Sequence, residues 1–386
     1  MRGLQNSPMR ILVLIHEYPP VGGGGGRVAE DICRGLVQRG HEIRVLTAHV
    51  AGQTMYEERD GVRIIRLRSG RRFPFQATFP SMLRFVLASV AAGLQLAREW
   101  KPDLIHAHFA VPAGPAARTL SNWMGVPYII TIHLGDVPGG APEKTDRWFQ
   151  WVYPFTPNVW KSASAIIAVS EFTRQLALKH YPVNIQVIPS GVDLAAFRER
   201  TITVGQPPSL IFTGRLVEQK NPLQVVHTLA ELKDLSWNCT LVGDGPLRGE
   251  LEDEINKNGL ADRFALTGWI DQKCVIEFLE RSDVLFMPSR SEGMPIAGIQ
   301  ALATGLAIVA GRTGGFTELV EQGVNGYLFD PTDRESPRRY LRELLTSPQR
   351  LLAFKRASRA MASRFDLQRV VDQYENLFQE ILRREE

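Results

Sequence analysis

Short apolar segments alternate with helical patterns along the whole chain, and this alternation limits the folds open to it. Strands that alternate with helices build βαβ units, whose strands pair in parallel. In the first half the predicted strands are Arg10–Ile15, Glu42–Thr47, Val62–Leu67, Leu104–Ala107, Tyr128–Ile132, Ala165–Val169 and Gln186–Ile188. In the second half they are Leu210–Thr213, Cys239–Val242, Phe264–Thr267, Val284–Met287, Ala307–Val309 and Tyr327–Phe329. Two such series predict an α/β protein with two doubly wound, Rossmann-like parallel sheets.

A polar segment, Thr201–Pro208, separates the two series of strands. A chain of 386 residues is long enough for two domains with separate cores. We therefore predict domains over residues 1–200 and 201–364, and a C-terminal helix over residues 365–386. Asp366 is the expected N-cap of this helix. Its apolar residues fall on one stripe: Val370, Tyr374, Leu377, Ile381 and Leu382.

The composition is that of a soluble protein, with 44% hydrophobic and 22% charged residues. The three cysteines form no C-x-x-C pair, which disfavours disulfides and zinc and fits a reducing compartment. The apolar run Ile11–Ile15 is too short for a signal peptide. The longest run, Phe85–Ala97, has about half the length needed to span a bilayer. We therefore expect a cytoplasmic protein without a transmembrane helix.

Positive charge is concentrated between Arg59 and Lys101, a segment that contains nine basic residues and only two acidic ones. Aromatic and aliphatic residues lie among them: Phe73, Phe75, Phe79, Met82, Leu83 and Phe85. This mixture suits contact with an anionic membrane surface. The alternative is a solvated loop followed by a helix that faces the core. No nucleic-acid-binding motif is present, so no nucleic acid partner is expected.

The segment Ser289–Ala301 carries the features of an anion site. A polar loop with Glu292 and Gly293 follows the strand Val284–Met287, and Pro295 is predicted at the first helical position. The free amides of a helix start bind anions, and those near Ile296 and Ala297 are expected to face a phosphate. Glu292 can accept hydrogen bonds from sugar hydroxyls.

Two cations follow the strand Leu210–Thr213: Arg215, directly after Gly214, and Lys220. When the bond between a sugar and a diphosphate breaks, negative charge grows on the β-phosphate, and fixed cations stabilise it. Arg supplies a planar fork and Lys a point charge. Because no Asp-x-Asp pair with metal-like surroundings is present, we expect these cations to replace a metal ion.

These residues resemble the family 4 glycosyltransferases, retaining enzymes of the two-domain GT-B fold. In that family a Gly-Arg-Leu segment followed by Lys-Asn holds the donor diphosphate, and a Glu-x7-Glu segment holds the sugar and ribose. Here Gly214-Arg215-Leu216, Lys220-Asn221 and Glu292 match, while Gln300 replaces the second Glu. We expect Gln300 to keep a ribose contact that is weaker by roughly 1 kcal/mol, because one charge-assisted hydrogen bond is lost.

The resemblance also implies roles for other parts of the chain. Residues 1–200 would bind the acceptor, residues 201–364 the nucleotide sugar, and the last helix would cross back to the first domain, with the ligands in an interdomain cleft. Met294 lies within the Glu292 segment, Ile270 would pass the nucleobase, and Gly314 and Gly315 would help to hold phosphate.

Five consecutive glycines, Gly22 to Gly26, follow the first predicted strand. Such a run permits close approach of the backbone to a ligand. With a helix starting near Arg27, the amides of Gly24, Gly25 and Gly26 could face a phosphate or an acceptor. The alternative is a flexible turn. Because Arg27 occupies the place of the third glycine of Gly-x-Gly-x-x-Gly, a nicotinamide dehydrogenase is disfavoured.

His133 ends a strand of the first domain, where open α/β sheets bind ligands. The resemblance implies that this histidine contacts the donor sugar. His106 and His108 match the family's His-x-His segment and are expected to be structural.

Together the residues and the resemblance predict a retaining, hexosyl-type glycosyltransferase. It would move a sugar from a UDP- or GDP-sugar to a glycan or lipid-linked acceptor in cell-surface polysaccharide or glycolipid synthesis. No cofactor is expected, because the nucleotide sugar is the substrate, and the enzyme would be metal-independent. The alternative, suggested by Gln300, is a weakly active or inactive nucleotide-sugar-binding subunit of a glycan-synthesis complex.

Overall fold

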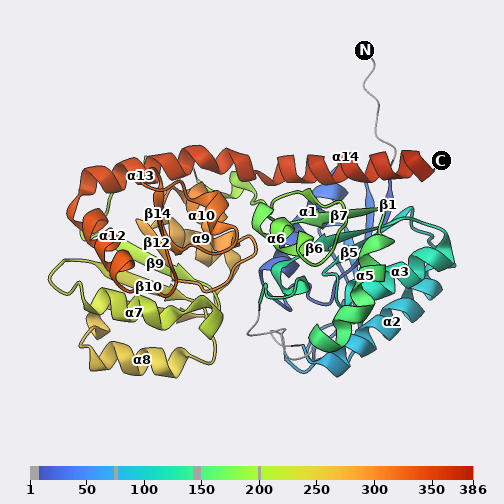
Figure 1. Ribbon diagram of the computed structural model, residues 1–386, viewed down its shortest axis with the longest axis horizontal. Coiled ribbons are helices and arrows are strands. Elements are labelled where there is room, and N and C mark those ends of the chain that lie inside the picture. Colours follow the sequence, from blue (N-terminus) through green and yellow to red (C-terminus); the bar gives the residue numbers. More distant parts are fainter. Residues whose placement is uncertain (1–7, 74–76, 142–148, 199–200, 386) are drawn as a thin grey trace, which may run out of the picture. The chain divides into compact units, whose positions relative to one another are not determined.

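The computed structural model describes residues 8–73, 77–141, 149–198 and 201–385. The chain divides into two compact units (Figure 1). Unit 1 comprises the residues up to Ser190 together with Leu367–Glu386, and unit 2 comprises Gly191–Asp366. The first boundary therefore falls ten residues before the predicted one at residue 200. Its physical cause is a backbone hydrogen bond of 3.0 Å from Val192 N–H to the Phe365 carbonyl, which ties this stretch to unit 2.

Unit 1 contains an eight-stranded sheet in the order β3-β4-β2-β1-β5-β6-β7-β8. Its strands are β1 (Arg10–Leu14), β2 (Glu42–Ala48), β3 (Tyr56–Arg59), β4 (Val62–Leu67), β5 (Leu104–His108), β6 (Tyr128–Ile132), β7 (Ala165–Ala168) and β8 (Gln186–Val187). All seven strands predicted for this half are present, with small shifts at their ends. The prediction missed β3, an antiparallel edge strand. Its polar sequence lacks an apolar run, and Asp60 and Gly61, both with positive φ, make the hairpin turn to β4.

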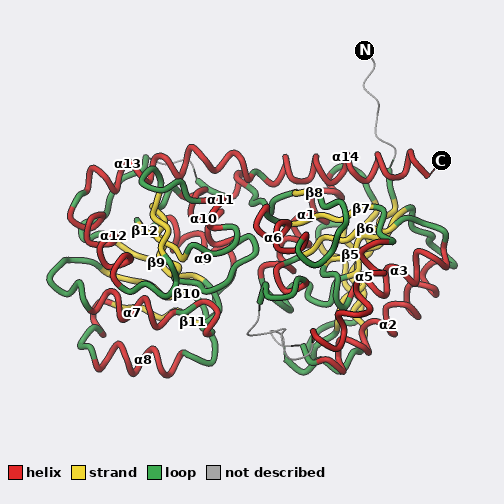
Figure 2. The backbone as a smooth tube through the Cα atoms, viewed as in Figure 1, coloured by secondary structure: helices red, strands yellow, loops and turns green. Residues whose placement is uncertain are grey.

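Helices cover both faces of this sheet (Figure 2). They are α1 (Gly24–Gln38), α2 (Phe79–Ala97), α3 (Ala113–Met124), α5 (Thr156–Lys161), α6 (Glu171–Leu178) and α14 (Leu367–Glu385). Right-handed crossovers place α1 on one face and α2, α3 and α5 on the other. The last helix, α14, packs on α1, and its Glu375 accepts hydrogen bonds from Arg39 (2.8 Å) and His41 (3.1 Å).

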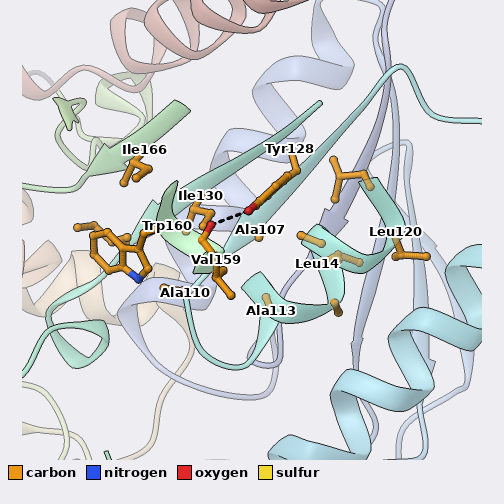
Figure 3. Close-up of a cluster of buried hydrophobic side chains, with 14 of the residues drawn as sticks. Leu14, Ala107, Ala110, Ala113, Leu120, Tyr128, Ile130, Val159, Trp160 and Ile166 are labelled. Atoms are coloured by element: carbon orange, nitrogen blue, oxygen red, sulfur yellow. Dashed lines mark hydrogen bonds between the residues drawn. The ribbon is translucent and has the colours of Figure 1, made fainter. Parts of the chain in front are cut away.

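The core between the sheet and the α2, α3 and α5 layer is apolar (Figure 3). Alternate residues of the strands point into it, among them Leu14, Ala107 and Ile130, and they meet Leu120 from α3 and Trp160 from α5. The residues between them on the strands, such as His106, point to the opposite face. The two faces of this sheet therefore differ, since histidines occur only on the second among the described residues of β5.

Unit 2 contains a parallel six-stranded sheet in the order β11-β10-β9-β12-β13-β14. The strands are β9 (Ser209–Thr213), β10 (Asn238–Val242), β11 (Phe264–Gly268), β12 (Val284–Met287), β13 (Ala307–Gly311) and β14 (Gly326–Phe329), so all six predicted strands are confirmed. The helices are α7 (Pro222–Ala230), α8 (Arg248–Lys257), α9 (Gln272–Glu280), α10 (Ile296–Thr304), α11 (Phe316–Leu319), α12 (Glu335–Thr346) and α13 (Pro348–Met361). The strand order reverses between β9 and β12, and open sheets bind ligands outside the carboxyl ends of strands at such a point.

Helix α2 corrects the expectation that no apolar segment is long enough to span a bilayer. Its 19 residues make it the one helix in the described part of the chain that is long and apolar enough to cross a membrane, judged by length and composition alone. The sequence estimate was too short because the helix begins at Phe79, six residues before the apolar run that was counted. Core helices of soluble proteins pass the same test. Here α2 packs on α3 and buries Phe85 in the core.

Candidate functional site

In unit 2 the loops that follow β9 and β12 are joined by hydrogen bonds. Arg290 N–H donates to the Gln219 carbonyl at 2.8 Å, and the Gln219 side-chain amide donates to the Ser291 carbonyl at 3.0 Å. These bonds hold residues 72 positions apart in the sequence as one surface. Gln219 was not foreseen, because an isolated Gln in a loop carries no sequence signal for such a role.

Lys220 and Glu292 form an ion pair at this junction. The Lys220 ammonium lies 2.6 Å from Oε1 and 2.8 Å from Oε2 of Glu292. Only 5% of Glu292 is exposed, so the pair is screened less than a surface ion pair. The sequence predicted both residues as functional, and the structure brings them into direct contact. Glu292 thereby fixes the position of the Lys220 charge.

Arg215 lies at the same carboxyl end of the sheet as this pair, because only Gly214 separates it from the end of β9. Gly214 N–H bonds to the Val242 carbonyl at 2.9 Å and so closes the strand end. The side chain of Arg215 is half-buried. The carboxyl end of β9 thus delivers Arg215 and, after one turn of 3-10 helix over Glu218–Lys220, Lys220.

Helix α10 starts one residue later than predicted. Pro295 is its N-cap, with extended backbone angles (φ −76°, ψ 108°), and Ile296 is the first helical residue. No side chain caps this end. The amides of Ile296 and Ala297 therefore lie in the first turn, where backbone N–H groups lack helical partners and favour anions. Gln300, one turn further along the helix, is 7% exposed.

Gly314 and Gly315 pack against the backbone of the Glu292 loop. A Cβ on Gly314 would lie 1.5 Å from the Glu292 carbonyl oxygen, and Gly314 has a φ of 51°. Gly315 N–H donates to the Gly293 carbonyl at 2.7 Å. No side chain fits at position 314, since the clash is with backbone. Both glycines thus position the loop that carries Glu292, Gly293 and the buried Met294.

Ile270 is not brought to this surface by a described contact. It follows β11, which lies two strands from β9 in the sheet. Its predicted nucleobase contact stays a prediction.

In unit 1 the glycine run enters helix α1. The helix begins at Gly24, not near Arg27 as predicted, with Gly23 as an N-cap that lacks a side-chain hydrogen bond. The reason is tertiary packing: a Cβ on Gly25 would lie 2.6 Å from the Phe109 ring and 3.2 Å from the His133 ring. Glycine is thus needed there for close approach and not for an unusual φ.

His133 lies beside this helix start. Its ring stacks on Phe109 with centroids 4.3 Å apart, and its backbone N–H donates to Oδ2 of Asp136 at 2.7 Å. Burial lowers the pKa of His133 to about 4, so the ring is neutral at pH 7. Its Nε2 has no hydrogen-bond partner among the described residues. Burial raises the pKa of Asp136 to about 7, against the opposing effect of hydrogen bonds from the backbone of His133 and Val111.

Three further histidines extend the ring cluster. His16 contacts Phe109 with centroids 4.9 Å apart, and His106 contacts His108 at 4.2 Å. His106 shares a hydrogen bond of 2.8 Å with Thr131, whose hydroxyl pairs with Tyr374 of α14. Burial lowers the pKa of His16 to about 4 and that of His106 to about 3.

His16 and Phe109 were missed in the sequence. The available signal was position alone, since His16 lies two residues after β1 and Phe109 directly follows β5, and these strands neighbour one another. Phe109 also has a φ of 70°, which no sequence pattern indicated.

The two units thus offer different chemistry. Unit 2 presents cations, a carboxylate and helix-start amides at one sheet end, a set suited to phosphate and hydroxyl groups. Unit 1 presents neutral imidazoles and a glycine helix start. Within the described ranges no group of three His, Cys, Asp or Glu side chains could hold a metal ion.

Comparison with known proteins agrees with this division. The family model "Glycosyltransferase Family 4" matches residues 22–196, and "Glycosyl transferases group 1" matches residues 195–361. The chain is 29% identical over 393 residues to a glycogen synthase of Mycobacterium tuberculosis, covering 94% of this chain and 92% of that protein.

Solved structures share the fold. A sucrose-phosphate synthase from Thermosynechococcus elongatus has a TM-score of 0.82 at 20% identity, with 96% of this chain and 98% of that chain covered. Anabaena HepE in complex with UDP-glucose has a TM-score of 0.77 at 21% identity, with 96% and 100% covered. The fold is therefore GT-B, as predicted. The two family models together span residues 22–361, and the chain belongs to the group 1 glycosyltransferases of family 4, which act on nucleotide sugars.

Proposed function

We propose that this protein is a retaining hexosyltransferase that takes a sugar from a UDP- or GDP-sugar and transfers it to a glycan or lipid-linked acceptor in polysaccharide or glycolipid synthesis. The observation that carries the proposal is the Lys220–Glu292 pair beside the uncapped start of α10. Relatives point the same way: one is named a glycogen synthase, and HepE was solved with UDP-glucose.

Each residue has a role in the proposed reaction. Arg215 and Lys220 stabilise the charge that grows on the leaving diphosphate, helped by the amides of Ile296 and Ala297. Glu292 accepts hydrogen bonds from the sugar hydroxyls, and Gln300 contacts the ribose. His133, neutral at pH 7, bonds to the donor sugar. The amides at Gly24, Gly25 and Gly26 bind phosphate or acceptor.

Metal independence and a cytoplasmic location belong to the same proposal. Two fixed cations supply the charge that a divalent ion would supply. The test is transfer in excess chelator: activity that disappears and returns with added magnesium or manganese contradicts this part alone.

A donor screen tests the reaction. Thermal shift with UDP, GDP and ADP should show which diphosphate stabilises the fold, because ligands that bind only the folded state raise its stability. Hydrolysis or transfer from the matching sugar nucleotides should follow. The corresponding monophosphates serve as controls and should stabilise less.

The second candidate is a nucleotide-sugar-binding subunit without catalysis, and Gln300 is the residue that motivates it. Tight diphosphate binding without transfer or hydrolysis across UDP-, GDP- and ADP-sugars would support this candidate. Turnover that depends on Lys220 would exclude it.

A further inference from the structure

Exposed large hydrophobic side chains are concentrated in one layer of unit 1. Of the eleven such residues in the described part of the chain, two lie in unit 2, Trp269 and Val324. Six lie on α2, on α3 and in residues 149–161: Phe79, Leu83, Leu87, Trp123, Trp151 and Phe155. Trp151 is 77% exposed and Leu87 63%. An exposed apolar patch of this kind marks an interaction site.

Helix α2 is apolar on its outer side as well as on its inner side, where Val90 and Leu94 pack against the core. It buries Ser81, Ser89 and Gly93 together with Phe85, while Leu83 and Leu87 are exposed. A helix that serves only to cover a core has polar residues on its outer side. The small residues permit close packing, since a Cβ on Gly93 would lie 2.6 Å from the Leu120 side chain. The buried side of α2 is therefore specialised for α3, and its outer side is left apolar.

The three segments are neighbours. Helix α3 contacts both α2 and α5, and Arg118 of α3 donates a 3.1 Å hydrogen bond to Ser162 at the end of α5 (Figure 1). Their inner sides pack on the sheet. The exposed side chains of this layer thus face away from the sheet or lie at its rim.

The charge of this layer has one sign. The segments Phe79–Ala97, Ala113–Met124 and 149–161 contain no Asp or Glu, and their charged residues are Arg84, Arg118 and Lys161. A Cβ on Gly70 would lie 2.6 Å from the Arg84 guanidinium, which places the exposed Arg68, Arg72 and Phe73 near the start of α2.

The structure changes which residues belong to the basic and apolar surface predicted from the sequence. Arg66 and Arg71 are buried and pair with Glu57 and Glu17, and Arg59 pairs with Glu30 and Glu57, so these three are structural. Phe75 lies outside the described residues. Of the exposed basic residues that remain, Arg63 lies on β4 and pairs with Glu58, and the others lie on or near α2. The apolar area extends to α3 and residues 149–161, which the sequence prediction did not include.

We propose that the outer side of the layer formed by α2, α3 and residues 149–161 docks on an anionic membrane surface. Tryptophan side chains and apolar residues insert at the boundary between headgroups and acyl chains, and nearby arginines bind anionic headgroups. A second copy is the poorer occupant, because a two-fold dimer through this face would bring like charges together. This docking does not depend on which sugar the enzyme transfers.

Cosedimentation with vesicles of equal parts phosphatidylcholine and phosphatidylglycerol tests the proposal. The wild-type chain should bind at low salt, bind pure phosphatidylcholine far less, and be released by high salt. The double variant Leu83→Ser/Leu87→Ser should lower the affinity at least about tenfold. Its control is Tyr56→Ser, an exposed apolar site on β3 outside the layer, which should bind as wild type does.

Charge reversal separates the electrostatic part. Arg72→Glu/Arg84→Glu should lower the affinity by about fivefold or more for each residue. Arg356→Glu/Arg369→Glu changes the net charge equally at exposed sites outside the layer and should have a much smaller effect. Wild-type protein that fails to bind anionic vesicles at low salt, or stays bound at high salt, overturns the proposal. So does a dimer in sedimentation velocity that the leucine variants dissolve while vesicle binding is absent. Thermal unfolding of each variant checks that it folds.

Discussion

The site residues of unit 2 include an ion pair in direct contact, whereas those of unit 1 are mainly buried histidines stacked with Phe109 and bordered by the Glu17–Arg71 ion pair. In unit 2, Glu292 fixes the ammonium of Lys220 next to helix-start amides. In unit 1, Phe109 and His133 pack against the start of α1, His16, His106 and His108 extend this ring cluster, and burial keeps the four histidines neutral. The same α/β architecture thus carries a cluster suited to phosphate charge in one unit and a cluster of neutral hydrogen-bonding rings in the other.

The largest effect is expected from Lys220→Ala. Loss of one preorganised charge donor typically costs about 10²- to 10³-fold in turnover. The variant also leaves Glu292 buried without its ammonium partner. Donor hydrolysis or transfer, measured as kcat, gives the readout. Lys257→Ala is the control, at an exposed lysine of the same unit, and should keep wild-type turnover. Equal turnover in Lys220→Ala and Lys257→Ala would show that the charge of Lys220 does not contribute to catalysis.

Acidification should destabilise unit 1 more than unit 2. A histidine whose pKa is lowered from 6.5 to about 4 in the folded state is protonated first in the unfolded chain, so stability is lost as the pH falls from about 6.5 towards 4. The pKa of Asp136 is raised to about 7 in the folded state, so this carboxyl favours folding more as the pH falls. The four histidines outweigh this opposing contribution. The expected loss between pH 7 and pH 5 is on the order of a few kcal/mol.

Amide hydrogen exchange at pH 7 and pH 5 measures the loss of protection in each unit separately. Unit 2 contains a single histidine, His227, which is exposed and serves as the internal control. Equal loss of protection in the two units would contradict the neutral-histidine account.

Gly314→Ala tests whether the Glu292 loop depends on a close backbone contact. The added methyl group would clash with the Glu292 carbonyl, at a φ of 51°. The steric clash and the strained backbone angle together should lower the free energy of unfolding by at least about 2 kcal/mol and weaken nucleotide binding.

Gly249→Ala in α8 is the matched control. No heavy atom lies within 4 Å of its Cβ position, so alanine should stabilise the helix by roughly 0.5–1 kcal/mol. Chemical denaturation measures both variants. A Gly314→Ala protein as stable as wild type would show that the loop adapts freely.

The smallest effect concerns Gln300. Gln300→Ala should weaken nucleotide diphosphate binding by about 1 kcal/mol, or roughly fivefold, if its amide contacts the ribose. Gln300→Glu should strengthen binding by a similar factor. Calorimetric titration with the preferred diphosphate measures both. Unchanged affinity in Gln300→Ala would mean that this side chain does not touch the nucleotide.

The sequence predicted the strands well, because apolar runs between turns are a local signal. All thirteen predicted strands are present, and β3 was missed because its stability comes from pairing with β4. In unit 2 the sequence singled out Arg215, Lys220 and Glu292, since charged residues at strand ends stand out, and the structure brings Lys220 and Glu292 into contact. In unit 1 the sequence predicted the glycine run and His133 but missed Phe109 and His16, because these two are brought there by the pairing of β1 with β5. The start of α1 was misplaced because packing of Gly25 on two rings outweighs the poor helix propensity of glycine.

The most direct test of the Lys220–Glu292 pair as a diphosphate site is calorimetric titration. The wild-type chain and Lys220→Ala are each titrated with UDP and GDP, and UMP and GMP serve as controls. We predict that one diphosphate binds the wild-type chain well, and that Lys220→Ala loses about tenfold or more of this affinity while monophosphate binding changes little. Equal diphosphate affinity in the wild-type and variant chains would contradict the claim that unit 2 binds the donor through this pair.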